Sequence, residues 1–297
     1  MKNKKTFLVT GGTGFIGRNI VNLLLKKNYK ILVLDDGSRG AFNKIINKKI
    51  KYIKGDIRKK NLLNKCLKKV DAVIHLAYIN GTRYFYEKPD VILDVAIKGL
   101  INVFDGCKKY KIKELYLASS SEVYQTPLKI PTDENEMLKI PDIYNPRYSY
   151  GGGKILTELM GIHYGKKFFK RLIIFRPHNV YGPNMGNEHV IPEFVKKMKS
   201  IKNKIFKIQG SGNEIRSFIY IDRIVIEGAY QNKGLGKIFY EDLIAFSKSN
   251  ASKRIACEVN IKPLNDRSII FHDSLGFKEV GQQDTNQGEK RVSLMAL

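Results

Sequence analysis

Three glycines lie between an apolar run and a segment with helical spacing. Gly11, Gly14 and Gly17 follow the run at residues 6–10 and lead into the apolar positions of 16–25. Glycine permits a tight turn and lets the backbone approach a pyrophosphate closely, while the first turn of a helix offers free N–H groups. The loop therefore predicts a dinucleotide site, with an ordinary turn between strand and helix as the alternative.

An acidic residue closes the next apolar run, at residues 30–35. Asp35 stands 18 residues after Gly17. A carboxylate at this place accepts hydrogen bonds from ribose hydroxyls and repels a 2′-phosphate. The loop and the acid together predict NAD, rather than NADP, as the cofactor.

A tyrosine and a lysine have the spacing of a proton-transfer pair. Tyr150 and Lys154 are four residues apart and fall on one face of a predicted helix. An ammonium beside a phenol stabilises the phenolate and lowers the pKa of the phenol from about 10 toward the working pH. The pattern alone is common, but Ser119-Ser-Ser-Glu-Val-Tyr124 stands upstream at the end of a buried strand. The combination makes a catalytic pair the specific interpretation.

The elements that must position these residues alternate between strand and helix. The expected strands are residues 6–10, 30–35, 51–54, 71–77, 114–118 and 171–175, and the helical segments between them are 16–25, 62–68, 91–109 and 154–169. This alternation predicts an α/β fold with a doubly wound parallel Rossmann sheet, covered on both faces. Ligands of such sheets bind at the carboxyl ends of the strands.

The pattern changes after about Asp222, inside a continuous sequence without a linker. The segments expected there are a strand at 223–226, a glycine turn at 234–236, a helix through 249, a strand at 255–260, a helix at 268–275 and a strand at 291–294. We therefore predict two domains, residues 1–222 and 223–297.

The motifs of residues 5–222 resemble the extended short-chain dehydrogenase/reductases, which are NAD-dependent nucleotide-sugar epimerases and dehydratases. They are the Gly11–Gly17 loop, Leu34-Asp35, Gly55-Asp56-Ile57, His75-Leu76-Ala77, the segment 119–124, Tyr150 with Lys154, residues 176–183 and residues 210–218. The resemblance implies oxidation and reduction at C4 of a nucleotide-sugar.

The resemblance also implies roles for single residues. Tyr150 would be the acid/base for the sugar 4-hydroxyl, Ser120 would donate to the same hydroxyl, and Lys154 would hold the nicotinamide ribose. Glu122 matches the glutamate that some decarboxylases and dehydratases use for later proton transfer. The implied NAD-binding residues are Gly11, Gly14, Phe15, Ile16, Gly17, Asp35, Asp56 (at the adenine), Ile57, Leu76, Ala77 and Lys154, and the implied diphosphate-binding residues are Asn179 and Arg216.

The chain departs from the family pattern at three places. Ala96 stands where an asparagine is usual, and Gln125 stands where a glycine is usual. Gly151-Gly-Gly153 fills the turn between Tyr150 and Lys154, although each helical glycine costs up to about 1 kcal/mol. Close approach of a ligand or a helix, or a loosened start of the helix, would explain these glycines.

A second glycine loop follows the change in pattern. Gln231, Gly234 and Gly236 form a Q-x-x-G-x-G loop whose N–H groups could cradle a pyrophosphate. With the residues that follow, it resembles the C-terminal half of the GNAT N-acetyltransferases over residues 223–297, which implies acetyl-CoA as a second cofactor. His272 stands where many members have a tyrosine as general acid. A neutral imidazole must first be protonated for that role, and simple packing is the alternative.

Each resemblance covers only a part of the domain that is usual in its family. The epimerase tail that completes the sugar lid, and the acetyltransferase half that builds the acceptor pocket, are not recognisable. We therefore expect a truncated substrate region, a partial GNAT-like unit, unpaired edges at the join, and sugar turnover that is weak or absent. The alternatives are N-acetyl transfer by the C-terminal part, or a fusion that binds cofactor without catalysis. The expected partner is a nucleotide-sugar, and a homodimer is left open.

The composition sets the remaining limits. The chain has 297 residues, with 53 Lys+Arg against 28 Asp+Glu and a net charge of +25. Lysine pairs are spread along the chain without aromatic interleaving, so we interpret the charge as compositional bias rather than a specific nucleic-acid site. Three scattered cysteines and five histidines without ligand spacing predict no metal site and favour a cytoplasmic location. No apolar run approaches the ~18 residues of a membrane span.

Overall fold

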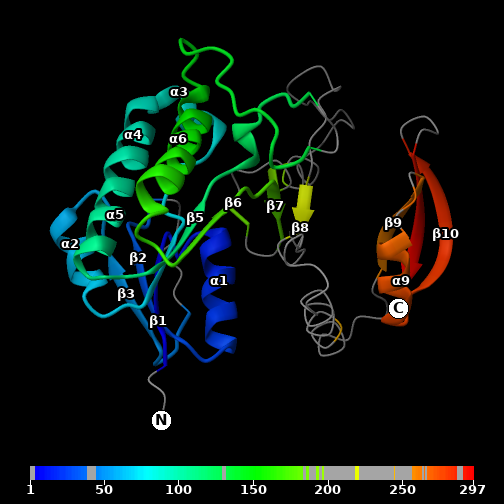
Figure 1. The fold of residues 1–297 in the computed structure, drawn as a ribbon, viewed down its shortest axis with the longest axis horizontal. Coiled ribbons are helices and arrows are strands. Elements are labelled where there is room, and N and C mark those ends of the chain that lie inside the picture. Colours follow the sequence, from blue (N-terminus) through cyan, green and yellow to red (C-terminus); the bar gives the residue numbers. More distant parts are fainter. Residues whose placement is uncertain are drawn as a thin grey trace. The chain divides into compact units, whose positions relative to one another are not determined.

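Six short apolar runs form a parallel sheet in the first part of the chain (Figure 1). Across the sheet the order is β3-β2-β1-β4-β5-β6, and each neighbouring pair is parallel. The strands are β1 Thr6–Thr10, β2 Lys30–Asp35, β3 Ile50–Lys54, β4 Ala72–His75, β5 Glu114–Ala118 and β6 Arg171–Phe175. The predicted doubly wound α/β sheet is confirmed.

The computed structural model describes residues 4–38, 45–128, 132–182, 185–186, 192–193, 196, 218–220, 244, 256–262, 264, 266–285 and 290–297. The chain divides into two compact units, Met1–Ile221 and Asp222–Leu297. In the first unit, a short parallel pair follows the sheet, made of β7 Asn179–Tyr181 and β8 Phe218–Tyr220.

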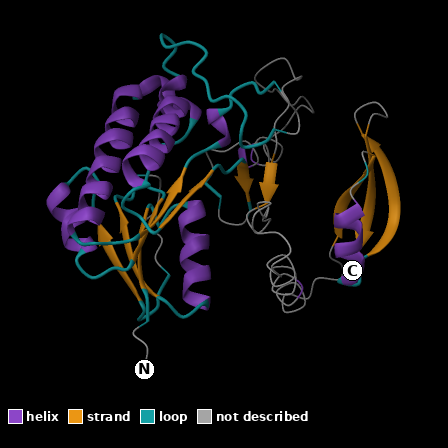
Figure 2. Cartoon of the chain, viewed as in Figure 1, coloured by secondary structure: helices purple, strands orange, loops and turns teal. Residues whose placement is uncertain are grey.

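Helices cover both faces of the sheet (Figure 2). They are α1 Phe15–Lys26, α2 Lys60–Leu67, α3 Thr82–Glu87, α4 Pro89–Asp94, α5 Leu100–Lys109 and α6 Tyr148–Leu159, with π-helical stretches at η1 Val95–Gly99 and η3 Met160–Gly165 and a 3-10 turn at η2 Ser121–Val123. The helix expected at 91–109 is thus α4, η1 and α5 in succession. The helix expected at 154–169 begins at Tyr148, six residues earlier.

Alternate residues of β1 to β5 enter two separate cores. On β1, Leu8 joins the core under α2 and α5, while Phe7 and Val9 join the core under α1 with Val21 and Leu24. Because both faces are buried, the strands are continuous apolar runs rather than alternating ones. This burial fixes the strands rigidly, and the loops at their carboxyl ends are held by them.

The second unit contains an antiparallel sheet. Its elements are β9 Ala256–Lys262, α9 Asp266–Ser274, β10 Lys278–Thr285 and β11 Lys290–Ala296, with strand order β10-β11-β9. Val259, Phe277 and Met295 form its small core. The sequence did not predict β10, because its residues 282–284 are polar and exposed and show no apolar alternation. The expected strand at 223–226, the loop of Gln231–Gly236 and the helix through 249 lie outside the described residues.

Within the described part of the chain, every helix is too short or too polar to cross a bilayer. The same part contains no group of three or more His, Cys, Asp or Glu side chains placed to hold a metal ion. The thiols of Cys66 and Cys107 are both buried and free.

Candidate active site

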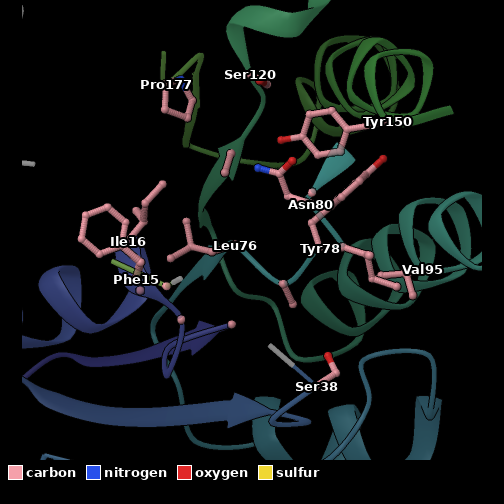
Figure 3. A pocket seen from close by; sticks show the side chains of 18 of the residues that line it. Phe15, Ile16, Ser38, Leu76, Tyr78, Asn80, Val95, Ser120, Tyr150 and Pro177 are labelled. Atoms are coloured by element: carbon pink, nitrogen blue, oxygen red, sulfur yellow. The ribbon is translucent and has the colours of Figure 1, made fainter. Parts of the chain in front are cut away.

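A cavity of about 410 Å³ opens at the carboxyl ends of the strands of the first unit (Figure 3). Its walls come from the loops after β1 to β6 and from α6. The strand order runs outward in opposite directions from β1 and β4, so the loops after these two strands diverge and leave a crevice. The cavity therefore lies where a doubly wound sheet binds its ligand.

The three glycines after β1 are needed for different reasons. Gly11 has φ +72°, and a Cβ there would lie 2.8 Å from the amide nitrogen of Ala77. A Cβ on Gly17 would lie 2.1 Å from the carbonyl oxygen of Gly11. At Gly14 the nearest atom would be 3.4 Å away, and this residue lines the cavity at the start of α1. The protein's own packing requires Gly11 and Gly17, whereas the space beside Gly14 is open to a ligand and fits a pyrophosphate.

We expect Gly14→Ala and Gly17→Ala to fail in different ways. Gly14 has an extended backbone that alanine also adopts, so Gly14→Ala should fold normally and lose about ten-fold or more in NAD affinity as its methyl group enters the pyrophosphate space. Gly17→Ala should lower the thermal midpoint, because the helix must move away from the loop. Calorimetry with NAD and a thermal melt of each variant measure the two effects. Equal NAD affinity in Gly14→Ala and wild type would contradict this assignment.

Two carboxylates stand at the ends of neighbouring strands. Asp35 accepts hydrogen bonds from the backbone N–H groups of Thr13 and Gly37, both at 2.9 Å, and lines the cavity. Asp56 also lines it and accepts from Arg58 Nε at 2.8 Å and Nη2 at 2.6 Å. Burial acts to raise the pKa of Asp56, but the hydrogen bonds from Arg58 outweigh it and the pKa is lowered. Both carboxylates therefore line the cavity, and Arg58 favours the ionised form of Asp56.

Apolar side chains complete the dinucleotide part of the cavity. The predicted residues Phe15, Ile16, Ile57, Leu76 and Ala77 all line it, and Figure 3 shows Phe15, Ile16 and Leu76 together on one wall. The backbone N–H groups of Leu76 and Ala77 donate to the hydroxyl of Thr10, which holds the loop after β4 against the end of β1.

The predicted catalytic pair lies on α6, at the other side of the cavity. Tyr150 is buried, stacks on Phe85 with ring centroids 5.1 Å apart, and points its hydroxyl into the cavity (Figure 3). Lys154 is also buried, and its Nζ donates to the carbonyl oxygen of Ala118 at 2.7 Å. Burial lowers the pKa of Lys154 to about 7, so its charge is poised near neutral pH.

Ser120 and Glu122 reach the same cavity from the end of β5. Ser120 caps η2, accepting from the backbone N–H of Glu122 at 3.2 Å. The Glu122 carboxylate pairs with Arg147 at 3.7 Å. Asn179, at the start of β7, lines the cavity as well. The structure thus brings together all the predicted residues of the first unit except Arg216, which lies outside the described residues, as do Gln231, Gly234 and Gly236.

A buried ionic network lies beneath these catalytic loops. Arg176, just after β6, donates to both oxygens of Glu158 on α6, at 2.8 and 2.6 Å, and to the hydroxyl of Tyr124 at 2.6 Å. Glu158 also accepts from the hydroxyl of Ser119. Ser119 precedes Ser120, so the network joins the loop after β5 to the helix that carries Tyr150.

The structure gives physical reasons for the departures from the family pattern. Gln125 has φ +52°, a left-handed conformation that favours glycine, and its amide donates to the carbonyl of Glu122 at 2.5 Å. Close neighbours explain two of the three glycines of α6. A Cβ at Gly153 would lie 2.1 Å from the Tyr78 hydroxyl and 3.2 Å from Ala96, and one at Gly151 would lie 2.8 Å from Gln125.

Several residues at or beside the cavity carry little signal in the sequence. Arg147 lines the cavity, and its ion pair is with Glu122 in another segment of the chain. Tyr78 and Phe85 carry no sequence signal, because their contacts with Tyr150 depend on how the loop after β4 and α3 pack against α6. Arg58, which holds Asp56, was also missed, although its position two residues later is a common turn pattern.

His272 in the second unit is buried. Its ring packs edge-on to Phe271 and Phe277, with centroids 5.3 and 5.6 Å away, and its Nδ1 lies 2.6 Å from the carbonyl oxygen of Ser268. A carbonyl oxygen accepts only, so Nδ1 carries the proton. These contacts agree with the packing alternative for His272.

Comparison with known proteins adds two family matches. A model of the NAD dependent epimerase/dehydratase family matches residues 7–225, and a model of the acetyltransferase (GNAT) family matches residues 208–277. Both resemblances stated from the motifs are confirmed. The two matches overlap at residues 208–225.

Individual relatives agree with the longer match. A provisionally named UDP-glucose 4-epimerase of Methanocaldococcus jannaschii is 37% identical over 278 residues, covering 91% of this chain and 83% of the relative. A dTDP-D-glucose 4,6-dehydratase of Dictyostelium discoideum is 33% identical over 234 residues, covering 73% of this chain and 53% of the relative.

A solved structure shares the fold. The UDP-N-acetylglucosamine 4-epimerase from Methanobrevibacter ruminantium M1, in complex with UDP-N-acetylmuramic acid, has a TM-score of 0.64 and 29% identity, over 74% of this chain and 70% of that chain. The sheet order, the cavity at its switch point and the extent of the family match lead to one conclusion. The chain belongs to the NAD-dependent epimerase/dehydratase family.

Proposed function

We propose that the first unit oxidises and reduces a nucleotide-sugar at C4. The observation that carries this proposal is the meeting of Tyr150, Lys154, Ser120 and Glu122 at one end of a cavity whose other end has the glycine loop and Asp35. The described residues fit NAD, which when bound would accept a hydride and return it. The relatives are named for epimerase and dehydratase activities, which share this oxidation, so the proposal extends to both.

Tyr150 takes the proton of the sugar 4-hydroxyl in this proposal. Its hydroxyl faces the cavity, and the buried Lys154 ammonium stabilises its phenolate. Ser120 donates a hydrogen bond to the same sugar hydroxyl. Glu122, paired with Arg147 at 3.7 Å, supplies the second base that a dehydratase or decarboxylase needs. Asn179, with Arg216, binds the diphosphate of the substrate.

The oxidation half-reaction is the sharpest test of this function. Purified protein at high concentration, mixed with NAD and UDP-glucose, should show a rise in absorbance at the NADH band within one turnover. dTDP-glucose and UDP-N-acetylglucosamine are the comparison substrates. This measurement detects C4 oxidation even when complete turnover is slow. NAD binding with no NADH formed from any of the three sugars would instead favour a chain that only binds cofactor.

The GNAT match supports a second candidate, acetyl-CoA binding by residues 223–297. The order β9, α9, β10, β11 of strand, helix and two strands suits the C-terminal half of that family. The same calorimetry with acetyl-CoA in place of NAD tests it, with Gly234→Asp as the variant expected to lose binding. Acetyl-CoA binding that is absent in wild type removes this candidate. The homodimer, the cytoplasmic location and the effect of a truncated lid stay predictions.

A further inference from the structure

A tyrosine in the loop after β4 is in contact with both members of the proposed catalytic pair. Tyr78 lines the cavity, and the Nζ of Lys154 lies 3.7 Å from the centroid of its ring. The ring also meets Tyr150 edge-on, with centroids 5.2 Å apart and an interplanar angle of 84°. One aromatic face therefore touches the ammonium, and the same side chain supports the phenol.

The hydroxyl of Tyr78 has no role in this contact. It points away from the cavity toward α6 (Figure 3), where a Cβ on Gly153 would lie only 2.1 Å from it. The oxygen is buried, and no hydrogen-bond partner for it exists among the residues that the structure describes. Burial raises the pKa of Tyr78, so the hydroxyl remains neutral. The contribution of Tyr78 to this contact therefore comes from its aromatic ring. Its buried hydroxyl is an unsatisfied polar group, which costs stability.

Among the groups around Lys154, the ring of Tyr78 gives the ammonium its main electrostatic stabilisation. Among the residues that the structure describes, the ammonium makes one hydrogen bond, to the carbonyl oxygen of Ala118. Burial and Lys154 itself lower the pKa of His75 to about 3, so this neighbour is neutral. Tyr150 is the other titratable group beside the ammonium, while Glu122 and Arg147 pair with each other farther along the cavity wall.

We propose that Tyr78 is a positioning residue whose ring face keeps the Lys154 ammonium charged and in place beside Tyr150. A cation over an aromatic face gains electrostatic energy from the ring, and the gain is larger where water is excluded. The proposal rests on the function proposed above, because only a charged Lys154 can stabilise the Tyr150 phenolate. Gly153 belongs to the same arrangement, since a side chain there would push the ring out of contact.

The pKa of Lys154 measures this effect directly. In protein labelled with ¹³Cε-lysine, one resonance should titrate far below the other lysines and vanish in Lys154→Met. We compare wild type, Tyr78→Phe and Tyr78→Leu. Tyr78→Phe keeps the ring, so the Lys154 pKa should match wild type, and the thermal midpoint should equal or exceed it. Tyr78→Leu keeps the site apolar without a ring, so the proton affinity of Lys154 should fall roughly three- to thirty-fold.

A second variant covers the case in which Tyr78→Leu does not fold. Trifluorophenylalanine at position 78 keeps the shape of phenylalanine but withdraws charge from the ring face, and it should also lower the Lys154 pKa relative to Tyr78→Phe. An unchanged Lys154 pKa in a folded leucine or trifluorinated variant overturns the proposal. No sugar takes part in this titration, so its result is independent of whether the protein turns over a nucleotide-sugar.

Discussion

Tyr150→Phe should lower the rate of C4 oxidation by about a hundred- to ten-thousand-fold, the usual contribution of a positioned acid or base. Phenylalanine keeps the stacking on Phe85 and the edge contact with Tyr78, so the fold and the NAD affinity should not change. The variant loses only the phenolic hydroxyl, which is the group expected to exchange a proton with the sugar. Single-turnover NADH formation, compared with calorimetric NAD binding, separates chemistry from binding.

Tyr148→Phe is the matched control for this experiment. Tyr148 begins the same helix but does not line the cavity, so its variant should react at the wild-type rate. If Tyr150→Phe retains the wild-type rate of NADH formation, another group removes the proton, and our assignment of the acid/base is wrong. An equal loss in both variants would indicate damage to α6 rather than loss of a catalytic group.

Arg176→Met should destabilise the first unit by about 3–5 kcal/mol, because it leaves the buried Glu158 carboxylate without its partner. Both Glu158 oxygens receive hydrogen bonds from this one guanidinium. Urea denaturation of wild type and variant measures the difference in free energy of unfolding. The hydroxyl of Ser119 would remain as a donor to Glu158, but it is neutral and cannot balance the charge.

Two further variants make this prediction specific. The double variant Arg176→Met with Glu158→Leu removes both charges of this pair. Most of the lost stability should therefore return. Lys60 and Asp105 form an exposed pair at 3.1 Å, and Lys60→Met should cost less than about 1 kcal/mol. A loss in Arg176→Met as small as that in Lys60→Met would show that the buried network contributes little.

Burial explains how well the sheet could be predicted. The strands at 6–10, 30–35, 114–118 and 171–175 have the same bounds in the sequence analysis and in the structure. The first three are packed against side chains on both faces, and the edge strand at 171–175 partly buries Leu172 and Ile174 on one face, so each apolar run ends near the end of its packing. The start of α6 was misplaced for the opposite reason. Gly151–Gly153 have poor helix propensity, and only tertiary contacts with side chains such as Tyr78 explain them.

The candidate site was predictable where its function depends on local backbone geometry. The glycine loop and Asp35 follow from spacing along the chain, because the turn and the strand end position them. Arg147 and Tyr78 were not identified, because their importance comes from contacts between segments far apart in sequence. The sequence showed which residues can do chemistry, whereas the residues that hold them in place emerged only with the fold.

The hydrogen bonds of Asp35 have a consequence for cofactor affinity. Each carboxylate oxygen already accepts one backbone N–H, from Thr13 and from Gly37, so the side chain occupies one rotamer before any ligand arrives. Binding a dinucleotide then costs little conformational entropy at this residue, where immobilising a free side chain costs about 0.5–1.5 kcal/mol. The remaining lone pairs stay directed at the cavity. We therefore expect the main chain to preorganise Asp35 for the ribose that the sequence predicts there.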